Sequence, residues 1–387
     1  VTGIADAMLD STPLVVISGQ VASSLLGSDA FQEADVVGIT QPICKWAVQV
    51  RKAEDIAKVI SRAFYIAQSG RKGPVVVDIT KDAQFGKIDS FEYQKTDFIR
   101  SYRPYPDIRE AEITTAAEII NAAKKPLALI GQGVLLGEAE KELLAFIEKA
   151  GIPAASTILG LSAIPSDHPL NVGMLGMHGN VAPNMKTNEC DVLIAIGMRF
   201  DDRVTGDLNT YAKQAKIIHL DIDPSEINKN VLVTARVLGD VKASLPQITE
   251  RINKNSHNEW RESFRVYDQQ EHDAVIKEEL YPASGQLKMG EVINKVSEAT
   301  NHEGVVVTDV GQHQMMAMRY FKFRDKSKSV VTSGGLGTMG FGLPAAIGAK
   351  YGAPDRTVCL FVGDGGIQMT IQKFGTIMQS GIDIKSI

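Results

Sequence analysis

Short hydrophobic runs alternate with longer segments of helical periodicity along most of the chain. Six such runs are Leu14–Ile17, Val75–Val77, Leu127–Ile130, Val192–Ile196, Val305–Val307 and Val358–Val362. Strands that are almost uninterrupted in hydrophobicity are typical of parallel sheets with helices on both faces. The pattern therefore predicts an α/β fold built from doubly wound parallel sheets.

Residues 53–67 form the clearest helical segment. Glu54 and Asp55 stand in its first turn, where acidic side chains are favoured, and Gly70 ends it. One face carries the hydrophobic residues Ile56, Val59, Ile60, Ala63, Phe64 and Ala67. This spacing predicts a helix that covers one face of a sheet.

Changes in composition divide the chain into three predicted domains. Residues 81–109 are polar and aromatic with two prolines, and residues 251–286 are strongly charged. We expect domains at 1–85, 108–250 and 287–387, with linkers at 86–107 and 251–286, the second partly helical. Residues 2–9 resemble the middle of a helix and 382–387 the start of a strand, so we expect further chain beyond both ends.

Overall composition excludes several classes of protein. The 387 residues carry a net charge of −5 with scattered basic residues, which predicts neither nucleic-acid nor membrane binding. Only Cys44, Cys190 and Cys359 occur, in no metal-binding or disulfide spacing. No hydrophobic run approaches the roughly 18 residues of a membrane span, and no signal peptide is visible. We expect a cytoplasmic protein with small-molecule partners.

Glycine follows five of the predicted strands. These glycines are Gly19, Gly131, Gly197, Gly311 and Gly363. Parallel sheets bind ligands at the carboxyl edge of their strands, where a missing side chain lets the backbone approach phosphate. For any one of them a tight turn is the better explanation. Five together favour ligand sites.

The last of these edges carries the most specific motif. Asp364 stands between Gly363 and Gly365 at a strand tip, and a helical segment at 367–379 follows. A carboxylate there suits a hard cation that bridges to a diphosphate, although an ordinary turn explains the tripeptide alone equally well. Upstream lies the dense glycine run 334–342, which is incompatible with a regular helix or strand and predicts a backbone wrapped around a ligand.

These motifs resemble the diphosphate-binding domain of thiamine-diphosphate enzymes. The sequences of residues 311–315 (GQHQM) and 333–348 (SGGLGTMGFGLPAAIG) are similar to those of the acetolactate synthase family. The resemblance runs over the whole chain and implies three domains of the thiamine-diphosphate-enzyme type. It implies Asp364 as the magnesium ligand and cofactor contacts at Val310, Gly311, Gln312, His313, Gly337, Met339, Asp364, Gly365 and Gly366. The family's motif continues to an Asn-Asn pair, which this chain does not reach.

The first two predicted domains resemble the same family. Phe31, Gln32 and Lys45 match the residues that line its substrate entrance, and the central segments match those that hold FAD. The implied FAD contacts are Arg71, Gly131, Gln132, Gly133, Thr157, Ile158, Met177, His178, Gly197, Arg199, Asp202, Val204, Asp221, Ile222, Asp240 and Val241. A nicotinamide site is the competing idea, but residues 131–137 do not form the GxGxxG pattern.

The resemblance also implies an activity. Family members decarboxylate pyruvate on thiamine diphosphate and join the product to a second pyruvate or 2-ketobutyrate, the first common step of branched-chain amino-acid biosynthesis. The activating glutamate would precede Val1, so we expect residues 1–387 alone to be inactive. We assign Arg203 to the second substrate's carboxylate, because a guanidinium matches a carboxylate in a bidentate way. An exposed ion pair with Asp201 is the alternative role of Arg203.

Other readings stay open at this point. The resemblance implies a homodimer or tetramer with sites between subunits and a small regulatory subunit. Glyoxylate carboligase and oxalyl-coenzyme A decarboxylase are related enzyme alternatives, and a non-catalytic scaffold is an alternative of another class. Ala22, Ser24 and Trp46 depart from residues common in relatives, but none of them is an assigned catalytic group.

Overall fold

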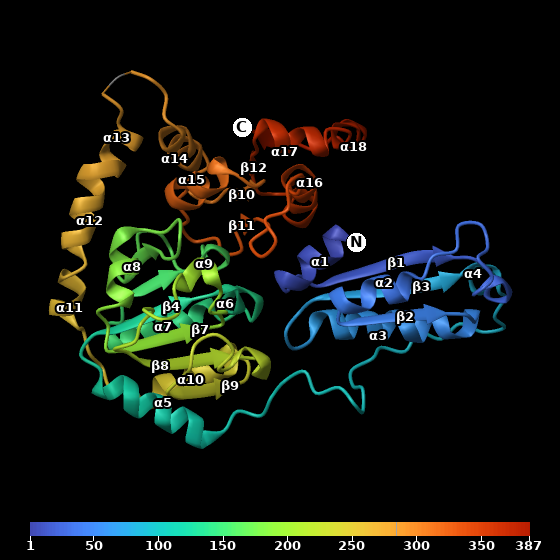
Figure 1. Cartoon of the computed structure of the whole chain (residues 1–387), viewed down its shortest axis with the longest axis horizontal. Coiled ribbons are helices and arrows are strands. Elements are labelled where there is room, and N and C mark those ends of the chain that lie inside the picture. Colours follow the sequence, from blue (N-terminus) through green and yellow to red (C-terminus); the bar gives the residue numbers. More distant parts are fainter. Residues whose placement is uncertain (284) are drawn as a thin grey trace. The chain divides into compact units, whose positions relative to one another are not determined.

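The computed structural model describes residues 1–283 and 285–387. It divides into two compact units, Val1–Tyr105 and Pro106–Ile387, and each is described here by itself. Figure 1 shows the helices and strands of both units. Together the units contain three separate parallel sheets, one in the first unit and two in the second.

The first unit is built on a three-stranded parallel sheet. Its order is β1 (Leu14–Gln20), β3 (Pro74–Thr80), β2 (Trp46–Val50), and every residue of the central strand β3 is buried. Helix α3 (Ile56–Gln68) covers this sheet, as the periodicity predicted, and buries Ala63, Ile66 and Ala67. Phe64 was expected on the covered face, but it is exposed and Ile66 is buried instead. The remaining elements are α1 (Thr2–Leu9), α2 (Val36–Thr40), α4 (Lys81–Phe85) and 3-10 turns at Ser23–Leu25, Gln41–Ile43 and Ala53–Asp55.

A six-stranded parallel sheet forms the first part of the second unit. Its order is β6 (Asn171–Met174), β5 (Ala154–Ser156), β4 (Pro126–Ile130), β7 (Val192–Ile196), β8 (Lys216–Asp221), β9 (Ala235–Leu238). Alternate residues of β4 enter two different cores, Ala128 and Ile130 on one face and Leu127 and Leu129 on the other. The helices are α5 (Glu110–Ala122), α6 (Gln132–Leu136), α7 (Glu140–Ala150), α8 (Val181–Thr187), α9 (Asp202–Thr205) and α10 (Val241–Arg251), with 3-10 turns at Ile158–Gly160 and Pro224–Glu226.

A four-stranded parallel sheet completes the second unit. Its order is β11 (Val330–Val331), β10 (Val305–Thr308), β12 (Val358–Phe361), β13 (Lys385–Ser386). Val306 faces the side covered by α14 (Met289–Ala299) and α15 (Gln312–Tyr320), and Val307 faces α16 (Gly342–Gly352). The single helix expected at 367–379 is wrong. Two helices occur there, α17 (Asp364–Met369) and α18 (Lys373–Ser380).

Residues 258–280, expected to be part of a linker, are mostly helical and packed. They form α11 (Asn258–Glu262), α12 (Arg265–Glu271), a π-helical turn (His272–Ile276) and α13 (Lys277–Leu280). Trp260 and Phe264 are buried in the core on one face of the six-stranded sheet. The Trp260 indole Nε1 donates a hydrogen bond to the Pro126 carbonyl at 2.8 Å. A few aromatic residues thus dock a highly charged segment, which composition alone did not indicate.

The predicted α/β class with parallel sheets is confirmed, and all six predicted strands are present. The start of a strand expected at 382–387 is also present, as β13. The strands that were not predicted, β2, β5, β6, β8, β9 and β11, are short or mix polar with hydrophobic residues. Among the helices that the structure describes, none is both long and apolar enough to cross a membrane.

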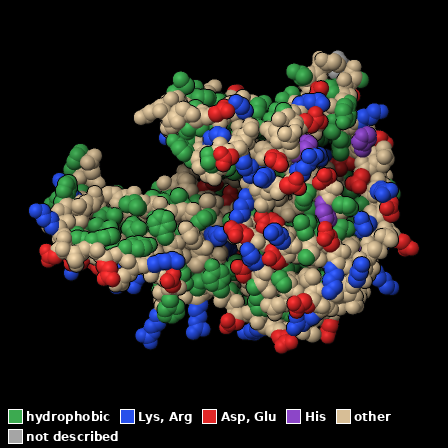
Figure 2. Space-filling view, turned by 180° about the vertical axis from the view of Figure 1, so that it is seen from behind, with side chains coloured by type: hydrophobic (Ala, Val, Ile, Leu, Met, Phe, Trp, Pro, Cys, Tyr) green, Lys and Arg blue, Asp and Glu red, His purple; other side chains and the backbone are tan. Residues whose placement is uncertain are grey.

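Large hydrophobic side chains are exposed on the first unit. They include Ile17, Phe31, Phe64 and Phe85. Figure 2 shows hydrophobic side chains spread over much of the visible face of this unit, at the left of the view. Exposed apolar surface of this kind is typical of a surface that another protein segment covers.

Lys186, at the end of α8, is enclosed by aromatic rings. Its ammonium Nζ lies 4.9 Å from the ring centroid of Trp260, 5.1 Å from Tyr267 and 5.7 Å from Phe264. It also lies 2.7 Å from the carboxylate Oε2 of Glu189. A desolvated cation over several rings interacts favourably with their negative faces, so Lys186 holds α11 and α12 against the central sheet.

We expect Lys186→Met to lower the free energy of unfolding by about 1–3 kcal/mol, because the cation–π and ionic contacts are lost while the volume is kept. Lys295→Met is the matched control, since Lys295 forms the same i,i+3 pair with Glu298 on an exposed face. We expect about 0.5 kcal/mol or less for the control. Chemical denaturation measures both, and equal losses would contradict a special role for the aromatic enclosure.

Candidate functional site

A buried carboxylate organises the carboxyl edge of the four-stranded sheet. Asp309 directly follows β10 and is fully buried. Its Oδ1 accepts the backbone N–H groups of Val310 at 2.9 Å and Gly340 at 3.1 Å, and its Oδ2 accepts that of Gly342 at 2.8 Å. Hydrogen bonds to an ionised group are among the stronger ones in proteins. Asp309 therefore fixes the glycine-rich loop to the strand.

The glycines around Asp309 are explained by close approach or by backbone conformation. A Cβ on Gly366 would lie 2.5 Å from Asp309 Oδ1, so only glycine lets α17 pack there. Gly311 and Gly337 have φ angles of +149° and +63°, which disfavour other residues. The glycine-rich loop thus follows a path that other residues would not adopt, and its role in binding a diphosphate stays a prediction.

His313 lies in the first turn of α15 beside this edge. Its Nε2 is buried and has no hydrogen-bond partner among the residues that the structure describes, and burial lowers the pKa of the imidazole despite the nearby Asp309 carboxylate. Its ring lies close to Gly311 and Gly363, because a Cβ built on either glycine would lie 3.0–3.4 Å from its atoms. A buried nitrogen without a partner is costly, which makes it a candidate ligand contact.

Asp364 is the first residue of α17 and is exposed at the tip of β12. The exposed Met339 reaches toward it, since its Cε lies 3.4 Å from the Cβ position of Gly365. The helix start, Asp364, Met339 and His313 are thus brought together by the ends of β10 and β12. In the described part of the chain no three His, Cys, Asp or Glu side chains are grouped as a metal site. Magnesium commonly takes one or two carboxylates together with phosphate oxygens, so Asp364 fits it as a shared ligand.

The glycines predicted to contact FAD have a structural role in the six-stranded sheet. A Cβ on Gly131 would lie 2.2 Å from the Gly197 carbonyl oxygen, and one on Gly133 would lie 2.7 Å from the Gly197 Cα. The Gly133 N–H donates to that carbonyl at 2.8 Å. The segments that follow β4 and β7 therefore approach each other so closely that only glycine fits. For Gly131 and Gly197 this contact explains the glycine without a ligand.

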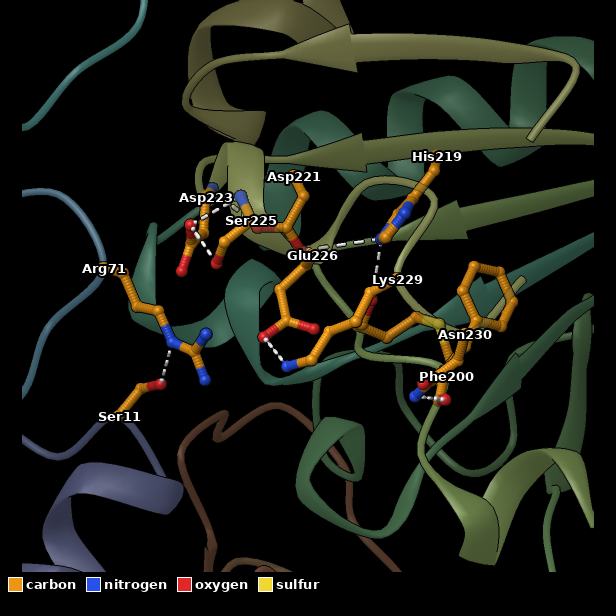
Figure 3. Close-up of polar contacts among 11 residues, drawn as sticks. Ser11, Arg71, Phe200, His219, Asp221, Asp223, Ser225, Glu226, Lys229 and Asn230 are labelled. Atoms are coloured by element: carbon orange, nitrogen blue, oxygen red, sulfur yellow. Dashed lines mark hydrogen bonds and ion pairs between the residues drawn. The ribbon is translucent and has the colours of Figure 1, made fainter. Parts of the chain in front are cut away.

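Figure 3 shows polar contacts around the ends of β8 and β7. The buried His219 ring nitrogen Nε2 lies 2.9 Å from the Met198 carbonyl, and Asn230 donates to the Phe200 carbonyl at 2.7 Å. Asp221, a predicted FAD contact, accepts the N–H of Asp223 at 2.8 Å. The bonds from His219 and Asn230 fix the segment that follows Gly197, in which Arg199 lies.

Several other predicted FAD contacts have local roles. The Asp240 carboxylate caps α10 by accepting the Lys242 N–H, and the buried Thr157 hydroxyl lies 3.2 Å from the Ile130 carbonyl. Met177 is 60% exposed, and the Met177 N–H donates to the Arg203 carbonyl at 2.8 Å. The rest are distributed around the same carboxyl edge. They are Gln132 in α6, Ile158 after β5, Arg199 after β7, Asp202 and Val204 in α9, Ile222 after β8, and Val241 in α10.

Arg203, the predicted substrate contact, is 66% exposed. Its Nη1 donates to the Met177 sulfur at 3.4 Å and its Nε lies 3.6 Å from Asp202 Oδ2. Asp201 Oδ1 caps α9 by accepting the Arg203 N–H at 3.0 Å, and the exposed ion pair that was considered from the sequence forms with Asp202 instead. The guanidinium therefore stays accessible to an anion.

The predicted entrance residues lie in the first unit. Phe31 is 88% exposed, and Gln32 has a φ of +66° in the same loop. The Gln20 amide donates to the Asp78 carboxylate and to the Ala34 carbonyl, which anchors the end of that loop to the sheet.

Lys45 has a different setting. Its Nζ donates to the carbonyls of Ile66 and Ser69 at the end of α3, and burial lowers its pKa to about 8. Lys45 therefore caps a helix, and its assignment as a substrate contact stays a prediction. Arg71, assigned to FAD, donates from Nε to the Ser11 hydroxyl at 3.1 Å (Figure 3).

Two family models match the chain. The central domain of thiamine pyrophosphate enzymes matches residues 113–248, and their C-terminal TPP-binding domain matches residues 309–387. The acetolactate synthase large subunit of Haemophilus influenzae is 41% identical over 99% of this chain. This chain belongs to the acetolactate synthase family. It is a thiamine-diphosphate-dependent enzyme of that family, and the TPP-binding match covers the edge formed by Asp309, Gly337, Met339 and Asp364.

Other acetolactate synthases are similar to the same extent. The isozyme 3 large subunit of Escherichia coli is 41% identical over 98% of this chain, and the large subunit of Corynebacterium glutamicum is 42% identical over all of it. The chain spans 67% of the length of the Haemophilus protein, 66% of the Escherichia protein and 61% of the Corynebacterium protein.

Sequence reasoning missed Asp309 as a separate element of the site. An acidic residue immediately after a fully hydrophobic strand is a usable signal for such a role. Sequence reasoning also missed Glu271 and Arg319, which form an ion pair. No signal pointed to that pair, because the two residues stand 48 positions apart in the sequence and meet only through packing.

We expect Asp309→Asn to detach the glycine-rich loop, because an amide offers one acceptor oxygen to three N–H groups. Losing charged hydrogen bonds costs about 1.5–3 kcal/mol each, so unfolding should become easier and thiamine diphosphate affinity should fall at least tenfold. Calorimetric titration and thermal melting measure the two effects. Asp383→Asn, at an exposed carboxylate paired with Lys385, is the control. Unchanged cofactor affinity in Asp309→Asn would contradict the loop-fixing role.

Proposed function

We propose that this protein forms acetolactate from two molecules of pyruvate, and 2-aceto-2-hydroxybutyrate from pyruvate and 2-ketobutyrate, as part of branched-chain amino-acid biosynthesis. The observation that carries the proposal is the edge of the four-stranded sheet, where Asp309 holds a glycine-rich loop beside His313 and Asp364. Membership of a family whose relatives are named acetolactate synthase supports the reaction.

Bound thiamine diphosphate supplies the nucleophilic carbon and the electron sink for decarboxylation. The N–H groups at the start of α17 and the glycine-rich loop would hold its diphosphate, and Asp364 would hold the magnesium ion that neutralises it. His313 Nε2, which is buried without a partner in the described part of the chain, would donate to or accept from the cofactor. Met339 would support the folded cofactor through its apolar side chain.

FAD is proposed to bind at the carboxyl edge of the six-stranded sheet. Met177 would offer an exposed apolar surface to the cofactor at this edge. Gly131 and Gly197 are already explained by the close approach of the segments that follow β4 and β7, so the exposed Met177 is the stronger support. FAD would be structural here, with no part in the net reaction.

The assembly is also a proposal. A homodimer or tetramer with sites between subunits agrees with the hydrophobic side chains exposed on the first unit. A small regulatory subunit is proposed because relatives are named large subunits. The substrate entrance would be lined by Phe31, Gln32 and Lys45. The carboxylate of the second substrate would be held by Arg203. The proposed location of the protein is the cytoplasm.

The proposal is tested by incubating the full-length protein with pyruvate, magnesium and thiamine diphosphate, where we expect acetolactate. Asp364→Ala should weaken magnesium and thiamine diphosphate binding together, at least tenfold each, because Asp364 would hold the ion that neutralises the diphosphate. Equilibrium titrations measure both affinities, with Asp383→Ala as the exposed control. Native affinity for both ligands in Asp364→Ala would refute the metal assignment, and no acetolactate from the wild type would refute the reaction.

Arg203→Lys should slow acetolactate formation far more than release of carbon dioxide, because the second substrate enters after decarboxylation. A lost bidentate charged hydrogen bond of about 1.5–3 kcal/mol corresponds to a roughly 10- to 100-fold slower carboligation. Carbon dioxide and acetolactate are measured side by side. Arg265→Lys, at an exposed arginine paired with Glu262, is the control. Equal loss of both products would show that Arg203 does not bind the second substrate.

A further inference from the structure

A buried ion pair joins two helices of the second unit. Arg319 of α15 donates from Nη2 to the Glu271 carboxylate Oε1 in α12. The two side chains are only 17% and 3% exposed. Burying both charges is costly unless their remaining polar atoms also find partners. Where those atoms bind indicates what the pair holds.

The remaining atoms bind one loop of the six-stranded sheet. Glu271 Oε2 accepts the Asn180 side-chain amide at 3.3 Å and the Val181 N–H at 3.1 Å. Arg319 Nη1 donates to the Gly179 carbonyl at 2.9 Å. Asn180 in turn accepts the Met174 N–H at 3.0 Å, which ties the loop to β6. Three segments that are distant in the sequence therefore meet at one pair of charges.

Two of these segments lead directly to proposed cofactor contacts. Helix α15 begins at Gln312 and carries His313 in the same rigid element as Arg319. The loop residues Gly179 and Asn180 follow Met177 and His178, which are proposed to contact FAD. The pKa of His178 is lowered mainly by burial and further by the charges of Arg203 and Arg319, so His178 also interacts electrostatically with the ion pair. A shift of α15 would therefore reach both sites.

We propose that Glu271 and Arg319 are positioning residues that fix α15 relative to the 177–181 loop, so that thiamine diphosphate and FAD each raise the affinity for the other. The identity of the two ligands rests on the proposed function. A coupling of this kind is reciprocal, since ordering the shared contacts for one ligand leaves less to order for the second. The contacts form a continuous physical path between the sites.

The variant that tests the proposal is Glu271→Gln. It keeps the size of the side chain and an acceptor for the loop but removes the charge that binds Arg319. The matched control is Glu262→Gln, which removes the same charge from the exposed pair between Glu262 and Arg265, 3.0 Å apart. Thiamine diphosphate dissociation constants are measured with and without FAD on cofactor-stripped full-length protein, well below the melting temperature.

We expect FAD to tighten thiamine diphosphate binding roughly tenfold in the wild type and in Glu262→Gln, a typical size for coupling between two sites. In Glu271→Gln the ratio should fall to about one to two. A purely structural role would lower the melting temperature and leave this ratio unchanged, which would overturn the proposal. A wild type that binds both ligands without coupling would overturn it as well.

Hydrogen exchange separates this proposal from the proposed function. In Glu271→Gln without ligands, amides of 177–181 and of 312–320 should both exchange faster than in Glu262→Gln. Faster exchange confined to 265–280 would overturn the positioning role. If the wild type binds no FAD, the proposed FAD site fails, while exchange still decides whether the pair positions both segments. Should Glu271→Gln not fold, Arg319→Lys, which keeps the charge but loses the two-pronged contact, is expected to lose part of the coupling.

Discussion

Burial of the central strands on both faces is the constraint on which the rest of this structure depends. In β4 and β10 successive side chains enter two different hydrophobic cores, so neither strand has a face free for chemistry. The backbones of these two strands also pair with a neighbouring strand on either side. Polar function is consequently confined to the carboxyl edges, and the loops there must be held by bonds that do not involve the sheet.

In the four-stranded sheet, Asp309 provides the bonds that hold the loop at the carboxyl edge. A carboxylate in this position would be unfavourable in an apolar core, but three backbone N–H groups surround it. The same oxygens exclude any side chain at position 366, so the loop and the start of α17 are set by one buried charge. Cofactor contacts then need no rigid secondary structure of their own. They take their positions from the residue that ends β10.

Much of this fold was accessible from the sequence because hydrophobic runs report directly on two-sided burial. The runs at β4, β7 and β12 and the periodic face of α3 were predicted on that basis. Strands such as β2 and β9 were missed because they are partly exposed and mix polar with hydrophobic residues. The break between α17 and α18 and the docking of α11 depend on tertiary contacts, to which a local pattern carries no signal.

Glycine shows most clearly where sequence reasoning stopped. One residue type at the ends of several strands suggested one cause, but the structure contains at least three. Gly131 and Gly197 allow two backbone segments to approach closely, Gly311 adopts a positive φ, and Gly366 makes room for Asp309. Only the last two surround the edge that the TPP-binding match covers. A glycine at a strand end therefore signals close approach, and whether backbone, carboxylate or ligand approaches is decided by what the neighbouring strand presents.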